Sequence, residues 1–278
     1  MFPKKLYHSN LLKPITRVLL TSILLVSISG WLPAQDSALF QENVSAISKQ
    51  NEWFNLLYMG AMFVLFAYNF LFYFIARDRA YIFYSFFVLT NGAYTFYVWM
   101  RLDPTLTESV LSNPDQLNYI ALITFFGIVS YTLFVQAFLE TKKVLPRWHS
   151  ILNGLAFISI PLLLLCLFIL FNNQLDNRYS TMIMALYICV SSLIGLVLGI
   201  PFYKTGDRKA YFFITGLMLL CVGVFLSAFT FAKYGRSGAF LFCFQSGSIL
   251  EVICFSLGLG YKQLVNEKEK QKVKLALF

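Results

Sequence analysis

Seven hydrophobic stretches dominate this chain of 278 residues, and each approaches or exceeds the length that a helix needs to cross a membrane. The hydrocarbon core of a bilayer requires about 20 apolar residues in helical form. The stretches cover residues 53–76, 81–100, 118–138, 151–171, 179–203, 211–231 and 239–261. The connections between them leave no room for a soluble domain. We therefore predict an all-α membrane protein, a seven-transmembrane helix bundle over residues 53–261.

Composition supports this class and argues against several others. Hydrophobic residues make up 58% of the chain and charged residues 13%, whereas a soluble domain carries about 25% charged residues. The net charge of +9 arises from Lys and Arg at the ends of apolar spans, not from a basic face, so we expect no nucleic-acid partner. The five cysteines lie inside apolar spans without CxxC spacing, and only two histidines are present. We expect no metal site, no cofactor and no catalytic residue.

The first 34 residues have the organisation of a signal peptide. Four basic residues, beginning with Lys4, precede an apolar core that runs to about Gly30, and Ala34 supplies a small residue at a cleavage point. An uncleaved anchor is the alternative. In both cases residues 35–52 form a short extracytoplasmic stub, which is too short to fold alone.

The distribution of basic residues predicts the orientation of the bundle. Thirteen Lys and Arg residues fall in the connections 77–80, 140–150 and 204–210 and in the tail, residues 262–278, against five on the other side. Basic residues concentrate on the cytoplasmic side of membrane proteins. We therefore expect the N-terminus outside and a charged, helical tail, residues 262–278, in the cytoplasm.

Two connections on the predicted inner side resemble one another. Residues 73–84 and 202–213 both contain an Asp among basic residues, followed by Ala-Tyr. Each Asp can cap the next helix or pair with its neighbouring Arg, and each Tyr is of a type that anchors at the membrane interface. An internal repeat and the shared demands of two tight hairpins both explain the similarity. The candidate structural residues here are Arg77, Asp78, Tyr81, Asp207, Arg208 and Tyr211.

Glu251 is the ionisable residue placed well inside a predicted span. A charge at this depth costs about 2.5–3.5 kcal/mol, so the side chain should face the bundle interior with a partner or be protonated. A switch or ligand contact is one interpretation, and an interhelical hydrogen bond to Ser246, Ser248 or another span is the other. Gly195 and Gly199 have the spacing that allows close helix approach.

These features resemble a known family. The hairpin sequence Arg77-Asp78-Arg79-Ala80-Tyr81 and the last span, in which Glu251 precedes the run Phe255-Ser256-Leu257-Gly258-Leu259, are similar to those of bacterial seven-transmembrane receptors with diverse intracellular signalling modules. The similarity extends over residues 53–266. It implies a sensor in the bacterial inner membrane, usually with a carbohydrate-binding-like outer domain and a kinase, cyclase or phosphatase output module. This chain departs from that pattern at both ends, with a short stub and a short tail.

The sequence thus predicts a transmembrane sensory receptor module. It would relay an extracytoplasmic or intramembrane signal through the last span to a cytoplasmic signalling partner or to an output module beyond a truncated tail. The lipid bilayer and a second copy of the chain are further candidate partners, and no ligand-binding residue is assigned. The alternative is a small-solute transporter or channel-like protein, which would show interrupted helices or several charges near the membrane midplane.

Overall fold

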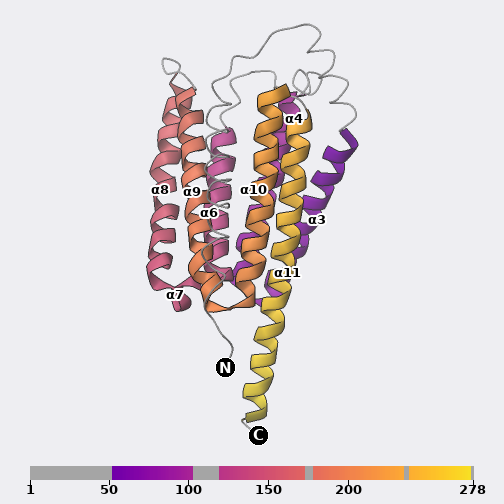
Figure 1. Ribbon diagram of the computed structural model, residues 1–278, viewed down its shortest axis with the longest axis vertical. Helices are drawn as coiled ribbons and strands as arrows, with labels where there is room; N and C mark the ends of the chain where they lie inside the picture. Colours follow the sequence, from indigo (N-terminus) through magenta and orange to yellow (C-terminus); the bar gives the residue numbers. More distant parts are fainter. Residues whose placement is uncertain (1–51, 103–118, 173–177, 235–237, 277–278) are drawn as a thin grey trace, which may run out of the picture.

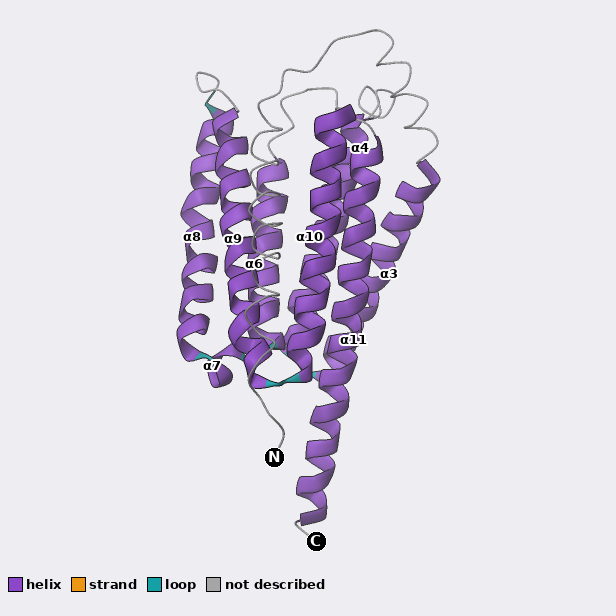
Figure 2. Ribbon diagram, in the orientation of Figure 1, coloured by secondary structure: helices purple, strands orange, loops and turns teal. Residues whose placement is uncertain are grey.

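The computed structural model describes residues 52–102, 119–172, 178–234 and 238–276, and within these ranges it is a helical bundle without strands (Figures 1 and 2). The predicted signal peptide, the stub and the connection 103–118 lie outside the described residues. The helices are α3 (Glu52–Ala76), α4 (Arg79–Leu102), α6 (Tyr119–Phe138), α7 (Thr141–Val144), α8 (Pro146–Phe171), α9 (Arg178–Thr205), α10 (Arg208–Tyr234) and α11 (Gly238–Ala276). The all-α prediction is confirmed for this part of the chain.

Six of the described helices are long and apolar enough to cross a membrane, namely α3, α6, α8, α9, α10 and α11. The predicted span 81–100 is also a long helix, α4, but it is less apolar because it carries polar residues such as Ser85, Asn91 and Thr95. The outer surface of the bundle is apolar, with Phe63, Leu164 and Leu186 each more than 60% exposed. Such a surface suits contact with lipid and not with water.

One connection differs from the prediction. The connection 140–150 is mostly helical, because α7 occupies its first part and α8 begins at Pro146, five residues before the predicted span. Proline favours the first turn of a helix, where its missing N–H is not needed. The tail was expected to continue the last span, and this is confirmed: α11 runs without a break to Ala276 and projects beyond the other helices (Figure 1).

An aromatic core holds the bundle together. The ring of Phe255 on α11 lies 5.2 Å from Phe134 on α6 and 6.1 Å from Phe213 on α10, and Tyr84 on α4 lies 5.0 Å from Phe134. All four side chains are fully buried. Aromatic pairs at these distances add about 0.5–1.5 kcal/mol each beyond their buried area. Phe255 therefore packs α11 against both α6 and α10.

Helices α10 and α11 approach each other closely where two glycines face one another. A Cβ atom built on Gly223 would lie 2.6 Å from the Cα of Gly247, and one on Gly247 would lie 2.7 Å from the Cα of Gly223. At Gly195 and Gly199, the nearest atoms to such a Cβ belong to side chains, at 3.8 and 3.1 Å. Gly195 and Gly199 therefore face side chains of α10, whereas Gly223 and Gly247 bring two backbones into contact.

Candidate functional site

The buried polar residues of α11 fall on one face of the helix. Gln245, Ser248, Glu251 and Lys262 are all buried, at separations close to multiples of the helical repeat. The opposite face carries exposed apolar side chains such as Leu257. Polar side chains inside a membrane protein are stable only when they face the bundle interior. The polar face of α11 therefore meets the other helices, and its partners define the candidate site.

The upper half of this face bonds to α3 and α4. Gln245 Nε2 donates to Asn55 Oδ1 at 2.9 Å. Ser248 Oγ accepts two hydrogen bonds, from Tyr58 OH at 3.1 Å and from Asn91 Nδ2 at 2.7 Å. All of these residues come from different parts of the sequence, so the bonds fix how α11 sits against the α3–α4 pair.

The same pattern continues toward the tail. Tyr84 OH lies 2.6 Å from the carbonyl oxygen of Val252 and 3.2 Å from Ser256 Oγ, and Tyr81 OH donates to the carbonyl oxygen of Leu259 at 3.2 Å. With the bonds above, these contacts form a line along α11 that we call the α11 ladder: residues Asn55, Tyr58, Tyr81, Tyr84 and Asn91 of α3 and α4 against residues 245–259 of α11. Hydrogen bonds between membrane helices contribute about 0.6 kcal/mol each on average.

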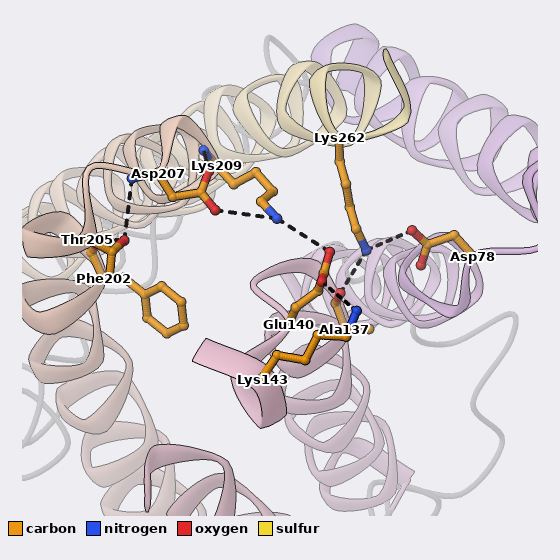
Figure 3. Close-up of polar contacts among 9 residues, drawn as sticks. All are labelled: Asp78, Ala137, Glu140, Lys143, Phe202, Thr205, Asp207, Lys209 and Lys262. Carbon is orange, nitrogen blue, oxygen red and sulfur yellow. Dashed lines mark hydrogen bonds and ion pairs between the residues drawn. The ribbon is translucent and has the colours of Figure 1, made fainter. Parts of the chain in front are cut away.

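The ladder ends at an ion pair. Lys262 Nζ lies 2.7 Å from Asp78 Oδ2 and donates to the carbonyl oxygen of Ala137 at 2.8 Å (Figure 3). The Lys262 side chain is only 5% exposed and that of Asp78 19%. Lys262 thus joins three elements: the α3–α4 turn, the end of α6, and α11 where it leaves the bundle.

A second ionic group lies beside it. Glu140 follows α6 and accepts from Lys209 at 3.4 Å and from Lys143 at 3.2 Å, while Lys209 also lies 3.4 Å from Asp207 (Figure 3). Burial alone would raise the pKa of Glu140, but the ammonium groups of Lys209, Lys143 and Lys262 outweigh it and lower that pKa from its ordinary value of 4.5. We call Asp78, Lys262, Glu140, Asp207 and Lys209, with the Ala137 carbonyl, the tail-end clamp.

The two similar hairpins use their Asp residues in the same way. Asp78 Oδ1 accepts from the backbone N–H of Ala80 at 3.0 Å, and Asp207 Oδ1 accepts from that of Lys209 at 2.9 Å. Each Asp therefore caps the helix that follows. The residue before each Asp has a left-handed backbone, with φ of 53° at Arg77 and 72° at Gly206.

The tyrosines of the two hairpins differ. Tyr81 is 3% exposed and bonds to α11, whereas Tyr211 is 45% exposed and packs its ring 5.3 Å from Tyr203. Counted from the capping Asp, Tyr211 lies one residue later than Tyr81, and one residue turns a helix by about 100°. Ala210 therefore holds the buried place that corresponds to Tyr81. The interface role expected for Tyr81 is wrong, since its side chain is inside the bundle. Arg77 and Arg208 are exposed at this end.

Glu251 is fully buried, but its carboxyl oxygens have no hydrogen-bond partner among the described residues. The two serines considered from the sequence are engaged elsewhere: Ser246 donates to the carbonyl of Phe242, and Ser248 belongs to the ladder. The hydroxyl of Tyr131 on α6 is likewise buried and has no hydrogen-bond partner in the described part of the chain. The core thus holds two buried side chains, Glu251 and Tyr131, whose polar atoms have no hydrogen-bond partner among the described residues.

Sequence reasoning identified Glu251 and both hairpins but missed Lys262 as a site residue, because it was assigned to the solvated tail. Its position directly after an apolar span, with an acidic turn at the same membrane depth, was the available signal. Nothing in the sequence distinguished Tyr58 and Tyr84 from the many other aromatic residues of the predicted spans. Within the described ranges no three His, Cys, Asp or Glu side chains gather to hold a metal ion.

Comparisons with known proteins identify the fold unit. No curated protein and no solved structure matches this chain at a significant level. The sequence profile of the family described as 7TM diverse intracellular signalling matches residues 51–262, which include every ladder and clamp residue. That range covers most of the 278 residues. The chain therefore belongs to the 7TM diverse intracellular signalling family.

Proposed function

We propose that this chain is the transmembrane module of a sensory receptor and that α11 is its output element. The observation that carries the proposal is the buried Lys262–Asp78 ion pair at the point where α11 leaves the bundle. Beyond Lys262, α11 continues to Ala276, which extends it by roughly 20 Å at 1.5 Å per residue. Any shift of the bundle that moves the ladder is carried by this continuous helix to whatever lies at its end.

The proposed orientation places the tail-end clamp at the cytoplasmic face of a bacterial inner membrane. The basic residues concentrated at this end support it, as does the apolar leader that would direct residues 35–52 to the outside. Seven membrane crossings follow if α4 spans as well, and its place in the bundle beside α3 and α6 supports that count (Figure 1).

The proposed signal is a change in bundle packing, not a reaction. The helix pair α10–α11 is locked by the Gly223–Gly247 contact, so these two helices would move together against α3, α4 and α6. The ladder and the clamp are then the contacts that such a shift would rearrange. An output enzyme would be a separate cytoplasmic partner or a module beyond the tail, and a second copy of the chain could supply the second half of a dimeric output.

A small-solute transporter is the rival function, and a cavity between α4, α6, α9 and α10 is the observation in its favour. Transporters commonly bind their substrates where helices are interrupted. The described long helices run without interruption, even through Pro161 and Pro201. Glu251 and Lys262 are the buried Asp, Glu, Lys or Arg residues of the described part, and Lys262 is already paired. These features favour the receptor.

The test is to fuse a kinase reporter to the end of α11 and to change the helical phase of the junction. Inserting two residues after Asn266 turns the reporter by about 200°, whereas inserting seven returns it to within about 20°. We expect the two-residue insertion to change basal kinase output and the seven-residue insertion to preserve it. Equal output from the parent and both insertions, at equal expression, would overturn the proposal.

A further inference from the structure

A pocket of about 260 Å³ lies between α3, α4 and α11, at the end of the bundle where α11 leaves it. Its described lining combines aromatic rings with polar side chains and includes no Lys, Arg or His. The volume is below the range of about 300–1,000 Å³ that is usual for drug-sized ligands, so the pocket suits a small chemical group. Gly260 of α11 lines it, and a Cβ atom built on Gly260 would meet nothing within 4 Å. The missing side chain of Gly260 therefore leaves this space free.

The most buried polar side chain of the lining is Asn69 on α3, which is only 1% exposed. Its Nδ2 donates to the carbonyl of Leu65 at 2.7 Å, which fixes the orientation of the amide and leaves Oδ1 as an acceptor. No described residue donates to this Oδ1, although the oxygen, unlike those of Glu251, keeps some accessible surface. A nearly buried carbonyl without a donor is unfavourable, and a ligand N–H would satisfy it. Asn69 therefore offers the pocket an unused acceptor.

The other polar groups of the lining also have acceptor oxygens to offer. Tyr81 donates its hydroxyl hydrogen to a backbone carbonyl of α11. Ser256 donates to the hydroxyl of Tyr84, because the one hydrogen of Tyr84 goes to another backbone carbonyl. Glu267 carries a negative charge, and one of its oxygens accepts from Gln263 at 2.9 Å while Oε2 accepts from no described residue. The polar lining thus calls for a ligand with hydrogen-bond donors and a positive charge.

The aromatic part of the lining suits the same ligand. The ring of Phe72 lies 5.7 Å from that of Tyr68 and 4.9 Å from that of Tyr81, so the three rings form one continuous wall. The face of an aromatic ring attracts a cation that lies within about 6 Å of its centre. A primary ammonium group has a positive charge and three N–H donors, whereas a quaternary ammonium group has the charge alone.

We propose that this pocket binds a primary ammonium group, with Asn69 Oδ1 and the Glu267 carboxylate as its acceptors and the aromatic wall beside it. The headgroup of an aminophospholipid and a free alkylamine both carry such a group. The pocket lies where the apolar spans end, which gives a lipid headgroup access to it. Binding does not depend on the proposed receptor function and is measured without an output reporter, so either proposal can fail alone.

The test is native mass spectrometry of the full chain, released from detergent micelles that contain one of three lipids: dioleoylphosphatidylethanolamine, its N-acetyl derivative or dioleoylphosphatidylcholine. Acetylation removes the positive charge of the headgroup, and the choline headgroup has no N–H donor. We expect the ethanolamine lipid to bind on the order of tenfold more tightly than either of the others. A parallel titration with butylamine, followed by thermal unfolding, shows whether a free amine binds as well.

Gly260→Leu fills the pocket and should abolish the preference for the ethanolamine lipid. Gly154→Leu is the matched control, since Gly154 of α8 likewise has nothing within 4 Å of a new Cβ atom, and it should bind like the parent. Leucine favours helix more than glycine, so both variants should keep the fold.

Two further variants test the acceptors one at a time. Asn69→Leu should weaken binding on the order of tenfold, because it removes a nearly buried acceptor of a charged donor. Glu267 is exposed, so Glu267→Gln should weaken binding only about threefold, and Glu269→Gln, also exposed but outside the pocket, should not. Stabilisation by butylamine without a lipid preference would assign the pocket to a soluble amine. Equal retention of the three lipids with no effect of butylamine, or a preference that survives in Gly260→Leu, would overturn the proposal.

Discussion

Lys262 and Asp78 form a nearly buried ion pair, 2.7 Å between Nζ and Oδ2, although Asp78 lies in the turn between α3 and α4 and Lys262 lies on the last helix, α11. The lysine also donates to the carbonyl of Ala137, so it bridges α6 and the α3–α4 turn. Since α11 leaves the bundle at this residue, the pair fixes the direction of the projecting helix. It connects the packing of the bundle with the place where an output partner would act.

Removing this pair should lower stability. Lys262→Met keeps the length of the side chain but leaves Asp78 buried without its cation, and breaking a mostly buried pair from one side costs about 3 kcal/mol. We expect a clear fall in the thermal unfolding temperature in detergent. Lys143→Met is the control, because Lys143 is 81% exposed in its pair with Glu140 and should contribute less than about 1 kcal/mol. Equal effects of the two substitutions would contradict the structure at this point.

The environment of Glu140, at the same end of the bundle, predicts that the stability of the fold depends on pH. Because the nearby lysines hold its pKa below 4.5 in the folded chain, the ionised form stabilises the fold above that pH, and this contribution is lost as the pH falls through the folded pKa. Glu140→Gln should therefore be less stable than the parent at pH 6, and the difference should shrink below about pH 4. The measurement is thermal unfolding of both proteins across this range. A difference that stays constant with pH would show that the ionisation of Glu140 is not involved.

The sequence predicted the helices well and the site only in part. Apolar length alone located the long helices, because a bilayer leaves a backbone segment little choice but to become a helix. Apolar length could not predict that Lys262 is buried, since this lysine would be solvated if the α3–α4 turn lay a few ångströms away. The Gly223–Gly247 contact was missed for a related reason: many glycines occur in these helices, and only the packing decides which two meet.

The glycine contact gives a prediction about packing. Gly223→Ala would place a methyl group 2.6 Å from the Cα of Gly247, so α10 and α11 must separate. Overpacking of this kind costs about 1–3 kcal/mol. Gly60→Ala is the matched control in another membrane helix, with nothing within 4 Å of the new methyl group, and it should be neutral or slightly stabilising. Thermal unfolding of the two variants distinguishes them, and a stable Gly223→Ala protein would argue against backbone contact between α10 and α11.

The orientation can be tested by labelling single cysteines in a background without the five native ones. Thr205 is exposed at the tail end, and Ser112 lies in a connection outside the described residues. A membrane-impermeant maleimide should label Ser112→Cys in intact spheroplasts and Thr205→Cys only after the membrane is broken. Labelling of both from the same side would require an even number of crossings between them and would overturn the proposed topology.

Substitutions at Glu251 test the role of a buried carboxyl that has no hydrogen-bond partner among the described residues. If it is only a structural group, replacing it with an apolar residue of similar size removes an unsatisfied polar group and should raise stability by about 1–2 kcal/mol. We therefore expect Glu251→Leu to unfold at a higher temperature than the parent. Glu251→Gln keeps a polar group there and should not gain this stability. Because Glu251 lies on α11, the helix proposed to carry the output, we also expect Glu251→Leu to change the basal output of the fused kinase reporter. A variant that is less stable than the parent would show that the carboxyl has a partner, such as an ordered water, and would restore the interhelical hydrogen bond as its role.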